Sequence, residues 1–484
     1  MLTLLGCLPI AGGVVAWLAR GRARQVIGFC VAALTLCGVV TAVVYRSGLG
    51  VSYSWMPQVG AYYALRLDGL SAWLSGVSAL IVAVVCGVHL SKREHAAPTF
   101  VPLVLILEGL TLFTFMADDA LLFFFFFEAT LVPMYFLISG GGDARRAGAA
   151  LKFLLYSLAG GLVLLGGILY LMVAGPSLRF EDLAQSALST VAQQVLCLVF
   201  FVSFAVKAPL VPLHPWLPDA LQHGQPGSPV LLVGLLDGIG LYGMVRFCIG
   251  VTPQGASWAA FGIEIVALVT VVYGALAAAV SRSLLRLAGF ASISHAGFMV
   301  LGLFAFTTAS MTGSMVYIGA HALSASALLL AISWAVARRG DSLKRGDFGG
   351  LARRAPVLAG VFLMAGLATL ALPGSVNFAA EFTVIVGAWA RHPVLAAVSL
   401  VGVLVAGVYV LWSYQVVFTG EPAVGDKPSK PHDIGRLSRL GAGVLLAAIL
   451  FVGIYPGPVQ QLVGENSQMA MTQAQASDPE PGGH

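Results

Sequence analysis

Apolar runs of about 20 residues recur along almost the whole chain, and no other feature restricts its fold as strongly. A helix of that length crosses the hydrocarbon core of a bilayer, where every backbone polar group must be bonded internally. The sequence therefore predicts an all-α polytopic membrane protein with about fourteen transmembrane helices. The runs lie at residues 2–19, 25–44, 68–91, 98–116, 119–139, 150–174, 187–210, 227–250, 256–280, 286–306, 311–337, 355–388, 393–418 and 437–457.

The composition excludes several other classes of protein. Charged residues make up 10% of the 484 residues and hydrophobic residues 58%, whereas a soluble domain carries about a quarter charged residues. The net charge of +5 does not indicate a nucleic-acid partner, because the basic residues fall in short loops. The six cysteines form no CxxC motif and no Cys/His cluster. We therefore expect no metal site and no iron–sulfur ligand set in this chain.

The loops between the runs alternate in charge. Loops that retain clusters of Lys and Arg lie in the cytoplasm, so we expect the odd-numbered loops there and both termini on the outer side. The polar tail from Glu465 is expected to be disordered. The odd-numbered loops hold Arg20, Arg22, Arg24, Lys92, Arg93, Arg145, Arg146, Arg282, Arg286, the basic run 338–354, Lys427, Lys430, Arg436 and Arg439, and the even-numbered loops hold only Arg46, Arg179 and Arg391.

A lysine and four prolines interrupt the run at 187–210 and the segment after it. Lys207 is followed by Pro209, Pro212, Pro215 and Pro218. Each proline lacks an N–H and disrupts the helical hydrogen bonds before it, and a cation at mid-membrane costs about 2.5–3.5 kcal/mol. A buried cation beside broken backbone is typical of an ion path. The alternative is a lysine near a helix end that reaches the interface beside an ordinary proline kink.

Other ionisable residues also lie within apolar runs. A carboxylate embedded in this way must pair, take up a proton or face water. Glu128 has a possible partner in Lys207, whereas Glu108 can equally be a structural carboxylate and Lys152 can reach the interface from a helix end. Two histidines beside serines in consecutive runs favour a hydrated proton relay over lone core histidines. The set comprises Glu108, Glu128, Lys152, Asp237, His295, His321 and Glu381.

The positions of these residues indicate an internal repeat. The seventh run is broken at Pro209, after Lys207, and the twelfth at Pro373 and Gly374, before Glu381. Each is the fourth of five runs, and a five-helix copy must be inverted relative to the first. Broken helices at matching places in inverted repeats mark a transport site. We predict helices 1–3 in residues 1–97, the two inverted five-helix repeats in 98–250 and 251–420, a loop and the last helix in 421–464, and the tail in 465–484.

Seven segments resemble one known family over about residues 60–420. They are EATLVPMYFLI, LKFLLYSLAG, VKAPLVPLHPWLPDA, SISHAGF, GAHALSASAL, GDFGGLARRAP and LPGSVNFAAEF. In order and spacing they resemble the subunit M family of bacterial NADH–quinone oxidoreductase (respiratory complex I), and more distantly the related cation/proton antiporter subunits. The resemblance implies fourteen helices with one proton channel. It also implies that NADH, FMN, iron–sulfur clusters and quinone are bound by partner subunits, with no cofactor in this chain.

The resemblance assigns roles to five of the buried residues. By position it implies proton transfer by Glu128, Lys207, His295, His321 and Glu381. Glu108, Lys152 and Asp237 remain further candidates for proton transfer. One departure concerns the centre of the path, because Gly238 stands where the family usually has a lysine. Asp237 precedes it but points about 100° away on a regular helix, and Gly238 leaves room for water.

The function implied is that of a proton-translocating membrane-arm subunit of NADH:quinone oxidoreductase in the bacterial inner membrane. The lipid bilayer and antiporter-like neighbours on both sides are the expected partners, and redox chemistry is expected in other subunits. Two alternatives stay open. The chain can be a subunit of a multisubunit sodium/proton antiporter, or a pump-inactive spacer of the membrane arm, as the glycine at position 238 suggests.

Overall fold

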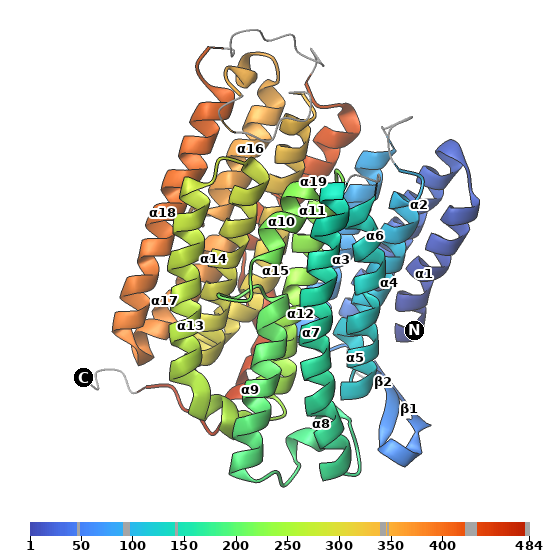
Figure 1. The fold of residues 1–484 in the computed structure, drawn as a ribbon, viewed down its shortest axis with the longest axis vertical. Coiled ribbons are helices and arrows are strands. Elements are labelled where there is room, and N and C mark those ends of the chain that lie inside the picture. The colour runs from blue at the N-terminus through green and yellow to red at the C-terminus, as the bar shows by residue number, and fades with distance from the viewer. Residues whose placement is uncertain are drawn as a thin grey trace.

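The computed structural model describes residues 1–45, 49–90, 97–140, 144–338, 345, 348–421 and 433–479. Within these residues eleven helices are long and apolar enough to cross a membrane (Figure 1). Three shorter apolar helices accompany them. The helical membrane fold is thus confirmed, while the count of fourteen spans and the inverted repeat stay predictions. Arg46, Lys92, Arg93, Lys427, Lys430, residues 339–344 and 346–347 of the basic run and the tail residues 480–484 lie outside the described residues.

The N-terminal part contains four helices and one hairpin, which the all-α prediction did not include. The elements are α1 (Leu2–Leu18), α2 (Gly21–Val44), β1 (Gly50–Met56), β2 (Ala61–Arg66), α3 (Gly69–His89) and α4 (Phe100–Met116). The two strands are antiparallel, with Tyr53 opposite Tyr63. The hairpin projects from one end of the helices (Figure 1). α1 packs against α2 and α4, and α3 against α2, α4 and α15.

The middle part contains the first broken run. Its elements are α5 (Ala120–Ala129), α6 (Leu131–Ser139), α7 (Ala144–Ala174), α8 (Phe180–Ala184), α9 (Thr190–Lys207), α10 (Trp216–His223), α11 (Ser228–Leu231) and α12 (Asp237–Gly243). α5 and α6 share one apolar run, separated only at Thr130. α12 lies between two π-helical turns, Leu232–Leu236 and Met244–Ile249.

The C-terminal part surrounds one central helix. Its elements are α13 (Pro253–Val280), α14 (Leu284–Phe304), α15 (Thr308–Val336), α16 (Pro356–Thr369), α17 (Val376–Arg391), α18 (Pro393–Phe418), α19 (Arg436–Ile454) and α20 (Gly457–Gln473). α15 packs against α14, α16, α17, α19, α20 and α3. The membrane-crossing part of α15 is entirely buried inside the protein, and that of α14 is 94% buried. Polar side chains on these two helices therefore face protein rather than lipid.

The first predicted helix break is present directly after Lys207. α9 ends there, and Pro209 cannot supply the N–H that would continue it. The backbone carbonyl of Val206 accepts a hydrogen bond from Nε1 of Trp216 at 2.9 Å, which satisfies one of the freed groups. α12 approaches the break at Gly240, where a Cβ atom would lie 2.7 Å from the amide nitrogen of Ala208. The break is thus enclosed by protein, as irregular backbone at membrane depth must be.

The second predicted break separates α16 from α17. α16 ends at Thr369 and α17 begins at Val376, with Pro373 and Gly374 between them. Gly374 has φ +94°, a conformation that glycine adopts without strain. The side chain of Ser375 accepts a hydrogen bond from the amide of Phe378 at 3.3 Å and so caps α17.

The prediction of disorder from Glu465 is wrong as far as Gln473, where α20 ends. Oδ1 of Asn466 accepts a hydrogen bond from the amide of Leu70 at 3.0 Å. The hydroxyls of Ser467 and Thr312 lie 2.7 Å apart. Polar residues of the tail therefore serve as partners of α3 and α15, and this pairing, which composition does not reveal, orders the helix.

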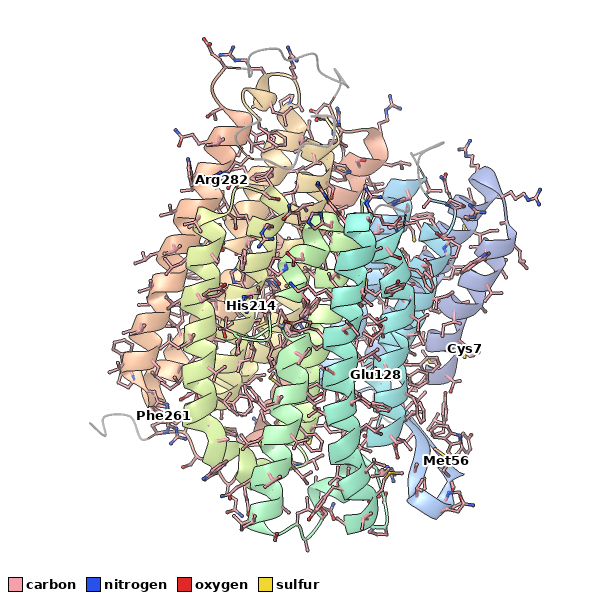
Figure 2. The ribbon with its side chains drawn as sticks, in the orientation of Figure 1. Cys7, Met56, Glu128, His214, Phe261 and Arg282 are labelled. Carbon is pink, nitrogen blue, oxygen red and sulfur yellow. The ribbon has the colours of Figure 1, made fainter. Side chains whose placement is uncertain are left out.

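The described chain ends lie at the same end of the molecule. Figure 2 shows Arg282 near one end and Met56 near the other. Thr3 accepts a hydrogen bond from Tyr63 of the hairpin at 3.1 Å. Asp478 accepts one from the amide of Thr308 at 2.8 Å, at the end of α14 that is remote from Arg282. Both described termini are thus on the side opposite Arg282.

Candidate functional site

Six buried polar side chains of the middle and C-terminal parts form two hydrogen-bonded groups. In the first group, the hydroxyl of Ser292 donates to Oδ2 of Asp237 at 2.8 Å and lies 2.9 Å from Nε2 of His321. In the second group, Nδ1 of His295 lies 2.7 Å from the hydroxyl of Tyr317, which donates to Oε2 of Glu381. The groups comprise Asp237, Ser292, His321, His295, Tyr317 and Glu381, from α12, α14, α15 and α17.

The two groups meet at the pair of histidines. The ring centroids of His295 and His321 are 5.1 Å apart. Nε2 of His295 and Nδ1 of His321 are buried, and neither has a hydrogen-bond partner among the described residues. Buried polar groups usually bond to protein or to ordered water, so the two unpartnered nitrogens mark a place for water. The gap between the groups is therefore short and polar.

Helix geometry accounts for this alignment. Tyr317 and His321 are four residues apart on α15, and Ser292 and His295 three apart on α14, so each pair shares one face of its helix. Glu381 follows the second helix break closely, in the first half of α17. A hydroxyl both donates and accepts, and an imidazole exchanges protons at either nitrogen. The two groups can therefore pass a proton between Asp237 and Glu381.

The N-terminal half holds charged groups without such bonds. Lys207 is only 1% exposed, and its Nζ has no hydrogen-bond partner among the described residues. Nζ lies 4.8 Å from the ring centroid of Phe127 and 5.6 Å from that of Phe153. Glu128 lies against Gly161, where an added Cβ would collide with its carboxylate. Figure 2 shows Glu128 between the two ends of the molecule.

Glu128 and Lys207 interact without touching. Glu128 and Asp237 lie near enough to Lys207 for their negative charges to attract its ammonium. Oε1 of Glu128 is itself unpartnered within the described residues, and no hydrogen bond joins it to the lysine. The structure thus places the predicted pair close enough to interact electrostatically, with aromatic rings rather than a direct bond at the ammonium.

A small cavity adjoins the first helix break. The space open to a water-sized sphere is about 10 Å³, roughly what one water molecule requires. A Cβ atom added at Gly238 would approach only Cγ2 of Ile318, at 3.1 Å. The lining residues include Ala208, Pro209, Asp237, Gly238, Ser292 and His321. The cavity therefore joins the break after Lys207 to the first hydrogen-bonded group.

Two further candidates lie apart from this arrangement. Both carboxylate oxygens of Glu108 are buried on α4 without a hydrogen-bond partner among the described residues. Nζ of Lys152 instead pairs with Oδ2 of Asp219 at 2.7 Å, and Nη1 of Arg286 pairs with Oδ1 of the same residue at 2.9 Å. Lys152 is thus part of a partly exposed ion cluster and is not joined to the two hydrogen-bonded groups.

Two features escaped the sequence analysis. Tyr317 was missed because a tyrosine in an apolar helix is typical of a core, and only its spacing from His321 could have indicated a role. Glu264 on α13 was also missed; its Oε2 lies 2.7 Å from Nδ1 of His392, beyond the end of α17. A carboxylate within an apolar run was the available signal for Glu264.

The family model described as "NADH:quinone oxidoreductase/Mrp antiporter, TM" matches residues 117–406. The chain belongs to this family. Subunit M of the NADH-quinone oxidoreductase of Mycobacterium tuberculosis is 34% identical, over 99% of this chain and 95% of the relative. Subunit 13 of the Thermus thermophilus NADH-quinone oxidoreductase is 32% identical, over 94% of this chain and 96% of the relative. The resemblance to the subunit M family is thus confirmed.

Solved structures of this family share the fold. A chain of respiratory complex I from Thermus thermophilus with bound NADH is 30% identical, with a TM-score of 0.88, and covers 98% of this chain and 100% of that one. A chain of the Mrp complex from Dietzia sp. DQ12-45-1b is 22% identical with the same TM-score of 0.88, over 98% of each chain. At that lower identity the likeness shows the fold alone. The protein is a multi-pass, antiporter-like membrane subunit of the complex I type.

Proposed function

We propose that this chain translocates protons as a membrane-arm subunit of NADH:quinone oxidoreductase, coupled to electron transfer in other subunits. One observation carries the proposal. Lys207 is buried at the helix break whose next residues, Ala208 and Pro209, line the cavity beside Asp237. From Asp237, ionisable groups and hydroxyls lead through the two histidines to Glu381. Intramembrane groups of this kind are expensive to bury and typically mark proton relays. A chain that only filled space in the membrane would not need them.

The path divides into an entry half and an exit half. Glu128 and Lys207 receive the proton, and His321, His295 and Glu381 carry it onward. The proton crosses between the halves beside the broken backbone after α9, where carbonyls and water can face each other. Each transfer moves one proton between neighbouring groups, so every group returns to its starting state after one passage.

The basic loops suggest the orientation of the path. The side that holds Arg282 is assigned to the cytoplasm of a bacterial inner membrane, and both termini to the outer side. The described chain ends both lie opposite Arg282, which agrees with this assignment. A proton pumped outward would then leave on the side of the hairpin.

Partner subunits supply the driving reaction. Relatives of this chain are named as subunits of NADH-quinone oxidoreductases, so we place other membrane-arm subunits, antiporter-like on both sides, against its lateral faces. NADH, FMN, iron–sulfur clusters and quinone are assigned to those partners. Many apolar side chains of α7 and α18 are exposed, as expected for faces that contact lipid or a neighbouring subunit.

The test compares two carboxylate substitutions for their effect on proton pumping by the complex in vesicles. Glu381→Gln removes the proton-accepting end of the path, and Glu181→Gln changes an exposed carboxylate on the short helix α8. NADH oxidation and proton release are measured together. Glu381→Gln should lower the number of protons moved per electron in a fully assembled complex, and Glu181→Gln should not. An unchanged ratio in Glu381→Gln would favour the spacer, and sodium-dependent proton flux without NADH would favour the antiporter.

A further inference from the structure

We infer that Asp237 is the central proton acceptor of this chain, reached from the Lys207 side through a water molecule held at the α9 break. The inference rests on the proposed function and names the residue that joins its two halves. Asp237 was a marginal candidate in the sequence, because a regular helix turns its side chain about 100° away from position 238. Four features of the structure place it on the path.

The first feature is the bonding of its carboxylate. Asp237 is 5% exposed, and its Oδ2 accepts a hydrogen bond from Ser292. Oδ1 is buried and has no partner among the described residues. A buried carboxylate oxygen without a partner costs more than an unpaired neutral group, so it normally bonds to ordered water. Oδ1 is thus the atom at which a water can deliver a proton.

The second feature is the cavity. Its open space of about 10 Å³ suits a single water molecule. A buried water needs about two to four polar partners, and Asp237, Ser292 and His321 all line the cavity. Pro209 also lines it, where the backbone is already broken. Water in this place would therefore touch both the break and the first hydrogen-bonded group.

The third feature is the backbone around Asp237. The π-helical turns Leu232–Leu236 and Met244–Ile249 flank α12. A π-helical turn takes one more residue than an α-helical turn, so it changes the direction of every side chain that follows, and such turns occur frequently at functional sites. The turn Leu232–Leu236 precedes Asp237 and so sets the direction in which α12 presents its side chains. Asp237 and Gly238 both line the cavity. Gly238 contributes space and Asp237 contributes the carboxylate.

The fourth feature is the charge of Lys207, which Asp237 attracts together with Glu128. Ala208 and Pro209 line the cavity but Lys207 does not, so the Lys207 side chain must first turn toward the break. Its ammonium then releases a proton to the cavity water while the water passes a proton to Oδ1. Lys207 becomes a neutral amine and Asp237 a carboxylic acid. The protonated carboxyl group then rotates so that its O–H faces the Ser292 oxygen, to which Oδ2 is bonded in this structure. Asp237 donates to the Ser292 oxygen while the Ser292 hydroxyl donates to Nε2 of His321. Asp237 is again a carboxylate, Ser292 is unchanged and His321 carries the proton.

Two substitutions test the acceptor and the water separately. Asp237→Asn keeps an oxygen for the Ser292 hydroxyl but cannot take up a proton, and Asp237→Glu restores a carboxylic acid. Gly238→Ala leaves every titratable group in place but puts a methyl group into the water space, near Ile318. The matched control is Ser294→Ala on α14, because the Ser294 hydroxyl donates to the backbone carbonyl of Val271 at 2.9 Å. Ser294 therefore lies outside the hydrogen-bonded groups.

Proton release per electron and coupled turnover are measured for the whole complex in vesicles. Asp237→Asn and Gly238→Ala should each slow coupled turnover at least about tenfold, Asp237→Glu should recover part of it, and Ser294→Ala should match the unmodified complex. Infrared difference spectra during turnover give a second readout. They should contain a carboxylic acid band that disappears in Asp237→Asn and persists in Ser294→Ala.

The outcomes separate this inference from the proposed function. If Glu381→Gln lowers the proton-to-electron ratio but Asp237→Asn leaves turnover and the infrared band unchanged, the proposed function stands and Asp237 is not the acceptor. If neither variant lowers the ratio, the proposed function itself fails. If Asp237→Asn slows coupled turnover and Gly238→Ala does not, the cavity water has no role in the transfer. If Asp237→Asn assembles poorly, the infrared band in Gly238→Ala decides, since its persistence at full size would contradict the inference.

Discussion

The two halves of the path place their buried charges in contrasting surroundings. From Asp237 onward, hydroxyls join Asp237 to His321 and His295 to Glu381 by direct hydrogen bonds. In the N-terminal half, the ammonium of Lys207 faces aromatic rings and has no hydrogen-bond partner among the described residues. The hydrogen-bonded side chains can pass a proton along without first moving. Lys207 must change its position, or bond to water, before it can pass a proton on.

The surroundings of Arg246 differ from those of Lys207 in the same way. Arg246, in the π-helical turn after α12, forms an ion pair with Asp68 and donates to the hydroxyl of Tyr242 at 2.8 Å. Arg246 is thus fully engaged, as a structural buried cation normally is. Lys207 lacks such partners although it is more deeply buried, at 1% exposed against 14% for the Arg246 side chain. The difference indicates that Lys207 is held for function, because an unpaired charge in this position weakens the fold.

The largest effect is expected when the N-terminal half loses its cation. Lys207→Ala leaves Glu128 and Asp237 without their counter-charge, which costs about 3–5 kcal/mol at such a site. Coupled turnover should therefore fall by about two to three orders of magnitude, measured as NADH-driven proton release. Lys207→Arg should also fail, because a guanidinium keeps its proton. Wild-type pumping by Lys207→Arg would reduce the lysine to a fixed counter-charge.

A strong but smaller effect is expected at the other end of the N-terminal half. Glu128→Gln removes the charge that attracts Lys207 and should slow coupled turnover about tenfold or more, since one pKa unit corresponds to about 1.4 kcal/mol. Glu128→Asp keeps the charge and should retain part of the activity. Normal assembly with an unaltered pumping rate in Glu128→Gln would remove Glu128 from the path.

A moderate effect is expected in the C-terminal half, because water can replace a missing hydroxyl. Tyr317→Phe removes the group between Nδ1 of His295 and Glu381 and should slow coupled turnover by about tenfold. Tyr242→Phe is the matched control, since the buried Tyr242 hydroxyl donates to the backbone carbonyl of Phe115 at 2.6 Å, outside the two hydrogen-bonded groups. Equal rates in both variants would show that the proton bypasses Tyr317.

The smallest effect on pumping is expected when the Asp68–Arg246 ion pair is removed. Its loss should instead lower the free energy of unfolding. Burial acts to raise the pKa of Asp68, but Arg246 and the Ser71 amide outweigh it and lower the pKa from 3.8 to about 2. The lowered pKa stabilises the fold by about 2 kcal/mol above about pH 4, and this contribution is lost as the pH falls toward 2. Acid unfolding should show this component in the unmodified complex and lack it in Asp68→Asn. A changed proton-to-electron ratio in Asp68→Asn would contradict a purely structural pair.

Much of the architecture could be predicted because its causes are local. Hydropathy alone locates helices such as α13 and α18. The missing N–H of Pro209 predicts the first helix break, and Pro373 with Gly374 predicts the second. Buried ionisable residues such as Glu381 are conspicuous within apolar runs. These signals depend on residue type and spacing along one segment.

The remaining features depend on contacts between segments. Tyr317 becomes a relay residue only because α14 and α17 place His295 and Glu381 on either side of it. The direction of Asp237 depends on the π-helical turn Leu232–Leu236, which shifts the helical register from the regular one that the sequence predicts. The order of α20 depends on Asn466 meeting a backbone amide of α3. Periodicity along one helix reveals none of these.

The central claim is that one continuous path joins the two halves, and a map of the native complex that resolves ordered water tests it most directly. The account predicts water at Nζ of Lys207 and at Oδ1 of Asp237, and a further water between Nδ1 of His321 and Nε2 of His295, all atoms that lack protein partners among the described residues. Dry, apolar surroundings at these atoms, with the two histidine rings still about 5 Å apart, would contradict a continuous path.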